Sequence, residues 1–377
     1  MLRKARMLTA WAATTRGEKR FLSGWWVFLI AVAMAAAIVL TRQQGANLEA
    51  SIQRHAARVG TDTAEPGQTQ PERTPPPGHD GDVPQTVKVG LYLDRIADMS
   101  IIGSSWKAYF YVWFTWTGDK LNPGETFQVV NGEILSKTLV DKRDEGNKHY
   151  ALYRTMALIS KNFDVTRFPR DDHMLTISIE DSALQSYQLR YETDETVSDI
   201  SSRVAAAGYK VLGKVAAVKP HSYKTSRGNP SLPTAFRATY SQFSFGVWIG
   251  RPSWGLFVKL TVILYAAVFL ALLALFVRSS CDRLALQTGA LFAAAANAYI
   301  SATLIPDTGV ATLADQMNWI GIACIGLGLL ESVIYQYQFE NVPERAHMVR
   351  LFDLSTFFLL AVLYVGMNIA IPLAASI

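Results

Sequence analysis

Hydrophobic stretches long enough to cross a lipid bilayer are the feature that most limits how this chain can fold. A membrane-spanning α-helix needs about 20 predominantly apolar residues. Five stretches approach that length: 21–40, 254–277, 284–304, 317–334 and 351–373. The polar segment between the first and second stretch is too long for a loop. The sequence therefore predicts a membrane protein with one N-terminal helix, a large polar domain and four further helices.

Basic residues beside the hydrophobic stretches predict how the chain is oriented. The net charge of +5 would by itself allow a nucleic-acid partner, but the distribution of charge argues against one. One acid, Glu18, precedes the first stretch, together with six basic residues: Arg3, Lys4, Arg6, Arg16, Lys19 and Arg20. Such a segment marks the cytoplasmic side of a membrane. The turn at 278–283 is also basic, whereas the charged residues of the turn at 307–315 are all acids. If the spans cross the membrane alternately, the first turn is cytoplasmic and the second lies outside, which agrees with these charges. We therefore expect a cytoplasmic N-terminus and a polar domain outside the cytoplasm.

The first hydrophobic stretch has two interpretations. It is either a retained anchor at residues 21–41, after a basic leader at 1–20, or a cleaved signal peptide. Its apolar run exceeds the 7–15 residues usual in signal peptides, which favours the anchor. Both cysteines, Cys281 and Cys324, lie in the C-terminal membrane part, so the exported domain has no disulfide.

The composition and the hydropathy pattern of the polar segment change along its length. Residues 42–84 are predicted to form a stalk and a flexible linker, because 60–84 holds six prolines and four glycines. From residue 85 onward, short runs alternate between apolar and polar side chains, which is typical of half-buried strands. The predicted strands are 87–94, 106–116, 127–140, 150–160, 173–180, 188–192, 209–218 and 235–249. Many short strands separated by turns predict a β-sandwich or barrel over 85–251, followed directly by a membrane domain at 252–377.

Several motifs follow one another in order along the predicted sandwich and helices. Segment 111–116, Tyr-Val-Trp-Phe-Thr-Trp, is an aromatic strand, and segment 168–175, Phe-Pro-Arg-Asp-Asp-His-Met-Leu, contains Phe-Pro-x-Asp before an apolar strand. Arg251 precedes the second hydrophobic stretch, and Pro306 follows the third. This order resembles the prokaryotic pentameric ligand-gated ion channels, bacterial relatives of the Cys-loop receptors that lack the flanking cysteines. The resemblance covers about residues 87–373, so the N-terminal anchor and linker are a departure from the family.

The resemblance implies a fold, a location and a mechanism. It implies a periplasmic immunoglobulin-like β-sandwich followed by a four-helix transmembrane domain in the bacterial inner membrane, assembled as a homopentamer. The implied activity is a ligand- or proton-gated ion channel rather than an enzyme, with no cofactor and no metal site. The implied partners are membrane lipid, permeant cations and an unknown small-molecule ligand or protons. The implied gating interface contains Phe168, Pro169, Asp171, Arg251 and Pro306.

The third hydrophobic stretch is expected to line the pore by resemblance. It is rich in alanine and in polar residues that are costly against lipid, which supports that expectation. The following residues are spaced by three or four positions and share one helical face: Ala285, Gly289, Phe292, Ala296, Tyr299 and Thr303. The segment Asp282-Arg283-Leu284 matches the start of the family's pore helix. This alignment implies that the same helical face points toward the axis of the pore.

Three of these positions have predicted roles. Phe292 would form an apolar collar and Tyr299 an upper aromatic ring, while a ring of Asp282 at the cytoplasmic mouth would favour cations. The alternative is that the small residues serve tight helix packing. Family members usually carry hydroxyl residues in the lower pore, where this chain has Ala285 and Gly289.

The resemblance also places a ligand site between neighbouring subunits, under the hairpin 221–233. Tyr223 lies near its tip, and Ser182 stands where amine-binding members often have an aromatic residue, so an amine box is not supported. Tyr223 beside acidic residues could still receive a cation. The candidate ligand-binding residues are Tyr111, Trp113, Glu180, Asp181, His221 and Tyr223. The alternatives are that Tyr223 is a strand-edge aromatic and that both acids are solvated.

Two further functions remain open. The first is a non-conducting membrane sensor or scaffold of the same fold, signalling through its N-terminal segment. The second is an anchored partner-binding module whose helices are only structural. No enzyme motif competes with these, because the sequence has no glycine-rich phosphate loop, no His-Glu-x-x-His helix and no cysteine pair with zinc spacing.

Overall fold

The computed structural model describes residues 14–60, 75, 76, 78, 79, 81–230, 232, 233, 236–338 and 346–376. The chain divides into two compact units. The helix unit comprises Met1–Glu49, Val165–Asp171 and Ser253–Ile377, and the strand unit comprises Ala50–Asp164 and Asp172–Pro252. Most of the predicted basic leader and of the predicted linker, residues 1–13 and 61–74, lies outside the described residues.

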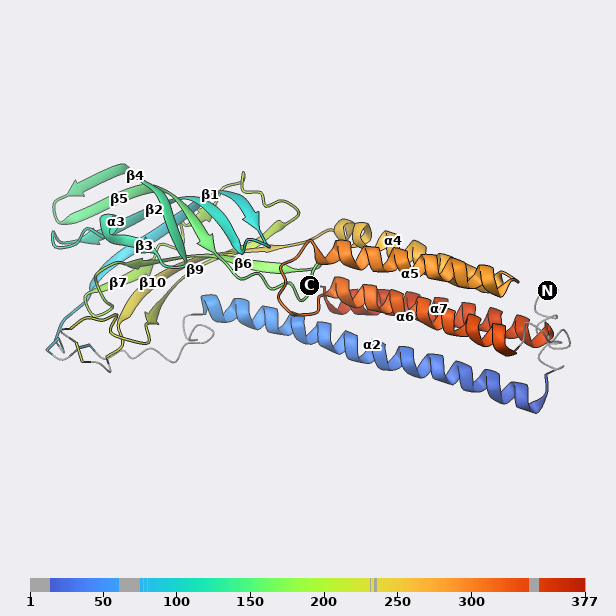
Figure 1. Ribbon diagram of the computed structural model, residues 1–377. Helices are drawn as coiled ribbons and strands as arrows, with labels where there is room; N and C mark the ends of the chain where they lie inside the picture. Colours follow the sequence, from blue (N-terminus) through green and yellow to red (C-terminus); the bar gives the residue numbers. More distant parts are fainter. Residues whose placement is uncertain are drawn as a thin grey trace. The chain divides into compact units, whose positions relative to one another are not determined.

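The strand unit contains two β-sheets (Figure 1). The six-stranded sheet has the order β4 (Gly132–Glu145), β5 (Lys148–Ser160), β2 (Ser105–Thr117), β1 (Gln85–Ser100) and β7 (Leu189–Thr193), with β8 (Asp199–Ile200) also paired to β1. The four-stranded sheet has the order β3 (Phe127–Val129), β6 (Asp172–Asp181), β10 (Thr239–Gly250) and β9 (Lys210–Ser222). The predicted β-rich domain is therefore confirmed. The predicted strand 127–140 is instead two strands in different sheets, after the short helix α3 (Pro123–Thr126).

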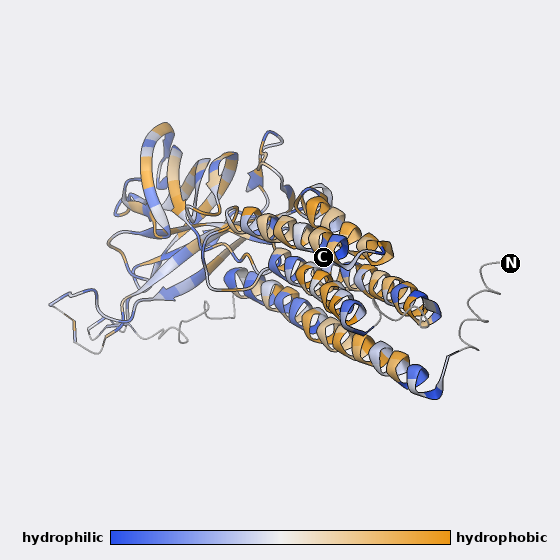
Figure 2. Cartoon of the chain, turned by 45° about the vertical axis from the view of Figure 1, so that its right-hand side comes forward, coloured by the Kyte–Doolittle hydropathy of each residue, from blue (hydrophilic) through white to orange (hydrophobic). Residues whose placement is uncertain are grey.

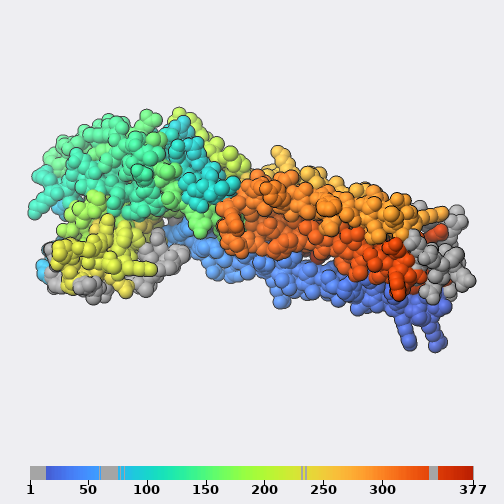
Figure 3. Space-filling model, in the orientation of Figure 1, coloured from blue at the N-terminus to red at the C-terminus, as the bar shows by residue number. Residues whose placement is uncertain are grey.

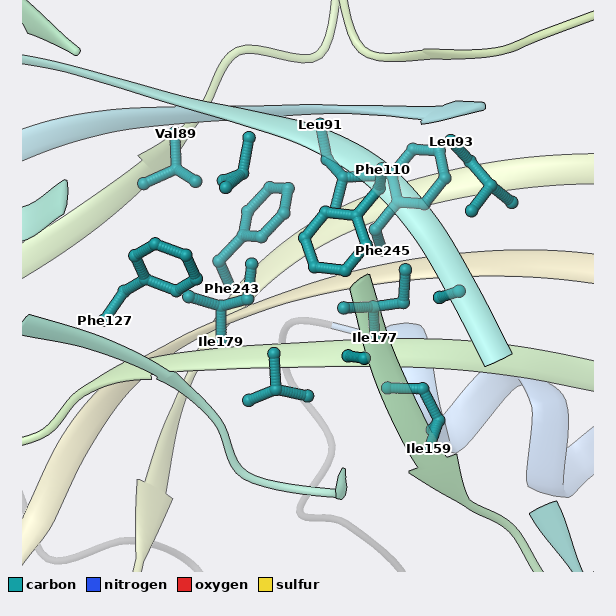
Figure 4. Close-up of a cluster of buried hydrophobic side chains, with 14 of the residues drawn as sticks. Val89, Leu91, Leu93, Phe110, Phe127, Ile159, Ile177, Ile179, Phe243 and Phe245 are labelled. Carbon is teal, nitrogen blue, oxygen red and sulfur yellow. The ribbon is translucent and has the colours of Figure 1, made fainter. Parts of the chain in front are cut away.

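One hydrophobic core receives side chains from both sheets. Period-two alternation sends one set of β1 side chains inward, including Val89, Leu91 and Leu93. Figure 4 shows these residues and Phe110 opposite Ile177, Ile179, Phe243 and Phe245 of the other sheet. All of these side chains are at most 1% exposed. Their burial is the main force that holds the two sheets together.

The described residues of the helix unit form five long helices. They are α2 (Arg16–Val59, whose last residues belong to the strand unit), α4 (Gly255–Leu273, extended by the 3₁₀ turn η1, Ala274–Phe276), α5 (Ser280–Ala302), α6 (Leu313–Gln338) and α7 (Ala346–Ala374). Within the described residues, four helices are long and apolar enough to cross a membrane: α2, α4 with η1, α6 and α7. Figure 2 shows the hydrophobic colouring along them. Helix α5 is long enough, but polar side chains make it less apolar than the other four.

Helix α2 contains the predicted N-terminal anchor and does not end at residue 41. It continues without a break to Val59, for 44 residues. Its first part lies along α6 and α7 (Figure 3). Trp25 Nε1 donates to Thr356 Oγ1 at 2.9 Å, and Trp26 Nε1 donates to Ser355 Oγ at 2.9 Å. The three helices also line a half-open apolar pocket of about 200 Å³.

Candidate functional site

Three of the predicted ligand-binding residues come together in the four-stranded sheet. Glu180 lies on β6, and Gln242 lies on the neighbouring strand β10. His221 near the end of β9 and Tyr223 just beyond it approach the same carboxylate. The Tyr223 hydroxyl donates to Glu180 Oε2 at 3.0 Å, and Gln242 Nε2 donates to Glu180 Oε1 at 2.8 Å. His221 Nδ1 contacts Glu180 Oε1 as well.

Both acids at this site are buried. Glu180 is 0% exposed, and the three side chains around it supply the hydrogen bonds that a buried carboxylate requires. Burial, followed by the charge of Glu180 and its hydrogen bond, raises the pKa of Tyr223 well above its ordinary value. Asp181 is 1% exposed and accepts from Thr126 Oγ1 and from the backbone N–H groups of Ala183 and Leu184. Neither acid is a solvated loop residue.

The positively charged side chain of Arg227 lies over two aromatic rings, those of Tyr223 in the hairpin and Tyr240 on β10. The guanidinium carbon of Arg227 is 5.0 Å from the ring centroid of Tyr223 and 5.4 Å from that of Tyr240. These distances are within the range of cation–π interactions. Sequence reasoning missed Arg227, because spacing alone does not show which face of Tyr223 the chain covers when it turns back.

The other two ligand-binding candidates lie on the six-stranded sheet. Tyr111 and Trp113 alternate with buried residues on β2, so they face away from the core. Trp113 Nε1 donates to Asp194 Oδ2 at 3.0 Å, and its ring lies directly over Gly90, where a Cβ atom would clash. Tyr111 is paired across the strands with Tyr92 and Arg154. Among the described residues, no hydrogen bond or ring contact joins Tyr111 or Trp113 to the Glu180 cluster.

The predicted pore-lining residues share the outward face of α5. Every one of them is exposed in the single chain: Asp282, Ala285, Gly289, Phe292, Ala296, Tyr299 and Thr303. Phe292 and Tyr299 are each 73% exposed, which is unusual for large aromatic side chains. The opposite face packs against α4 and α6.

Most polar side chains of α5 lie on the packed face rather than the outward one. Asn297 Nδ2 donates to Asn318 Oδ1 of α6 at 2.8 Å, and Gln287 Nε2 donates to the carbonyl of Ala271 of α4 at 3.3 Å. Ser301 is also buried and bonds within the helix. These residues therefore explain the low hydropathy of α5 without a pore, although Asp282, Thr288 and, just after the helix, Thr303 remain outward.

A buried ionic cluster lies at the start of α5. Arg283 is 0% exposed, and its guanidinium is 2.9 Å from Asp353 Oδ1 of α7 and 3.6 Å from Glu331 Oε2 of α6. Arg283 Nε donates to the carbonyl of Val277 at 2.8 Å, and the guanidinium stacks on Tyr335. The sequence assigned Arg283 to a basic turn, because its acidic partners are distant in sequence.

The proline loop predicted at the gating interface, Val165–Asp171, belongs to the helix unit. The backbone N–H groups of Leu313 and Ala314, at the start of α6, donate to the carbonyls of Thr166 and Phe168 at 3.1 and 3.0 Å. The loop therefore satisfies N–H groups that a helix N-terminus leaves without intrahelical partners. Arg167 NH1 donates to the carbonyl of Ala375 at 2.9 Å.

The five residues predicted at this interface have different surroundings. Phe168, Pro169 and Asp171 are buried in the loop, whose Phe168–Pro169 peptide bond is cis. Arg251 belongs to the strand unit, where it donates to the Tyr209 hydroxyl at 2.7 Å and stacks on its ring. Pro306 is half-buried in the connection between α5 and α6.

Comparison with known proteins leaves the chain without an assigned relative. No family model matches the sequence, and no curated protein matches it. Across the described ranges, no group of three or more His, Cys, Asp or Glu side chains is placed to hold a metal ion. The functional inference therefore depends on the motifs and on the geometry above.

Proposed function

We propose that the chain is one subunit of a homopentameric ligand- or proton-gated ion channel in a bacterial inner membrane, with α5 lining a cation-selective pore. The observation that supports this most directly is the outward face of α5. It combines small residues with two aromatic side chains that are each 73% exposed. A ring of five such faces would enclose an axis whose narrowest levels are Phe292 and Tyr299, and apolar constrictions of this kind can block ions by dewetting.

The proposed gating mechanism is a two-state change. The two sheets form a periplasmic immunoglobulin-like sandwich, and a ligand or protons bind at its interface between subunits. Binding shifts the proline loop around Pro169 and Asp171 against the start of α6, where its carbonyls accept the N–H groups of Leu313 and Ala314. The α5 helices then tilt and the level of Phe292 rehydrates. The ligand must bind the open form more tightly than the closed one, because it can shift the equilibrium only by that difference.

Assembly and conductance test this proposal together. Purified full-length protein in lipid nanodiscs should have the mass of five chains by mass photometry. In planar bilayers it should pass current that depends on pH or on an added ligand. A stable monomer or dimer would contradict the channel, and pentamers without current under any tested ligand or pH would favour the second function below.

The second function, a non-conducting sensor that signals through its N-terminal segment, is favoured by the contacts of α2. In the helix unit, Gln44 Nε2 donates to the carbonyl of Thr166 in the proline loop at 3.4 Å. In the strand unit, Asp172 accepts from Ser51 Oγ at 3.4 Å and its Oδ2 is 3.2 Å from His55 Nδ1. One helix that begins in the predicted leader thus contacts both the proline loop and the strand that follows it.

Spin labels would distinguish the two functions. Arg20→Cys, placed in a chain that also carries Cys281→Ser and Cys324→Ser, gives one labelling site near the start of α2. A sensor should change the label-to-label distance when ligand binds, with no current in bilayers. A channel should pass current whether or not these distances change.

A further inference from the structure

We propose that the ligand of the hairpin site is an anion, a small carboxylate-bearing molecule, and that Arg227 is its principal counter-charge. This inference rests on the proposed function, because it assumes that the hairpin 221–233 receives a ligand. With the residues that flank it, the hairpin site covers 219–237. It reverses the charge that the sequence alone suggests, in which acids beside Tyr223 receive a cation. The reason for the reversal is that the fold buries both acids.

The two acids predicted at the hairpin site, Glu180 and Asp181, are not available to a ligand. Glu180 is 0% exposed and is bonded by His221, Tyr223 and Gln242. Asp181 is 1% exposed and is bonded by Thr126 and two backbone N–H groups. An incoming amine would therefore have to break internal hydrogen bonds to reach a negative charge, and each buried group left unsatisfied is costly.

The exposed charges of the hairpin are all positive. Residues 219–237 contain four lysines or arginines and one histidine, and no acid. Lys219 is buried, and its ammonium donates to the carbonyl of Ala57 at 3.1 Å. Lys224, Arg227 and Arg237 are exposed. A molecule that approaches the hairpin from solvent therefore meets a cationic surface, which attracts anions.

Arg227 is also positioned where an amine would have to bind. Its guanidinium lies 5.0 Å from the Tyr223 ring centroid and 5.4 Å from that of Tyr240. An amine would have to displace this cation from both rings. An anion needs no displacement, because a guanidinium stacked on an aromatic ring still presents its N–H groups at its edge for a bidentate contact with a carboxylate.

The outward face of the other sheet offers a second arginine. Arg154 on β5 is paired with Tyr111 on β2 and is exposed, and its side chain makes no hydrogen bond or ion pair to another described residue. The two-arginine site requires a pentamer in which the neighbouring subunit presents this sheet toward the hairpin. Arg227 of one subunit and Arg154 of the next would then hold the two ends of a dicarboxylate.

Binding to the full chain in nanodiscs, measured by isothermal titration calorimetry, tests this inference without a current. The probes are acetate, succinate and glutarate as carboxylates, and butylammonium as the matched cation. The carboxylates should bind and butylammonium should not. Arg227→Gln should weaken succinate binding by roughly tenfold or more, since a charge-assisted bidentate contact is lost. Arg190→Gln, which removes an exposed arginine from β7, should leave it unchanged.

The outcomes separate this inference from the proposed function. Binding of butylammonium overturns the inference, as does the failure of every carboxylate at millimolar concentration or succinate binding that survives Arg227→Gln. Arg227→Lys keeps the charge and should bind with intermediate affinity, which controls for a folding defect in the glutamine variant. Succinate binding without conductance would remove the channel and keep the anion site. Conductance gated by an amine would keep the channel and remove the anion site.

Discussion

At the scale of single residues, the strand unit holds a lysine whose charge depends on pH near neutrality. Lys161 follows β5, and its ammonium lies 5.5 Å from the ring centroid of Phe163. Burial, together with the positive charges of Arg58 and Arg54, lowers the pKa of Lys161 from 10.5 to about 7. Arg54 also pairs with Asp164, which offsets part of its effect on Lys161.

This pKa predicts how stability changes with pH. Between pH 7 and 10.5 the unfolded chain binds the lysine proton and the folded chain does not, so stability rises with pH across that window and is lowest below pH 7. Lys161→Met removes the penalty. It should stabilise the protein by up to roughly 5 kcal/mol at pH 6 and by roughly 2 kcal/mol at pH 9, since each pKa unit corresponds to about 1.4 kcal/mol and pH 9 lies about 1.5 units below the unfolded-state pKa.

Denaturant unfolding followed by tryptophan fluorescence at pH 6 and pH 9 measures the effect. Lys120→Met removes an exposed lysine and serves as the matched control. It should change the free energy of unfolding by the same small amount at both pH values. An equal gain for Lys161→Met at both pH values would show that hydrophobic packing, and not proton binding, is responsible.

At the scale of elements, periodicity predicted strands and helices well, but not the partners of their side chains. Alternation in β1 predicts which residues enter the core, because the core imposes period two on the strand. The outward face of α5 follows from its spacing of three and four in the same way. The Arg283 cluster could not be predicted, because hydropathy does not reveal that Glu331 and Asp353 approach one arginine from two other helices. Arg227 was missed for a similar reason, since its contact depends on the conformation of a turn.

The outward face of α5 leads to a prediction about its aromatic collar. Phe292→Ser should hydrate the narrowest level, so a closed channel should leak or open at a weaker stimulus. Bilayer currents and mass photometry are measured on the same preparation. Phe358→Ser on α7, which removes a ring that is also exposed (55%), should leave resting conductance unchanged.

The alternative role for Phe292 is a contact between helices of neighbouring subunits. Truncation there would remove packing of the kind that is worth roughly 3–5 kcal/mol in a soluble-protein core, and the pentamer should weaken. Intact pentamers with no increase in resting conductance would therefore rule out Phe292 as the gate.

At the scale of the whole molecule, the proposed pentamer would turn single charges into rings. Asp282 is exposed in the first turn of α5, where the helix dipole favours an acid. Asp282→Lys loses that local stabilisation, roughly 0.3–1 kcal/mol per subunit, which is too little to unfold the helix unit. The ring of five, however, changes from negative to positive.

Ion selectivity should follow the sign of this ring. Under a salt gradient, the reversal potential of Asp282→Lys channels should move toward the value expected for an anion-selective pore. The reversal potential of Asp282→Asn channels should lie between those of the wild type and of Asp282→Lys. A reversal potential that Asp282→Lys leaves unchanged would show that residue 282 is not at the pore mouth.

The two faces of α5 are subject to different demands during evolution. Residues on its packed face, such as Arg283, Gln287 and Asn297, keep each single chain folded, so most replacements there would be eliminated whatever the protein does. Residues on the outward face touch little within the chain, and a Cβ atom added at Gly289 meets nothing within 4 Å. In the proposed channel, changes of a few outward side chains would therefore alter permeation without altering how the subunit folds.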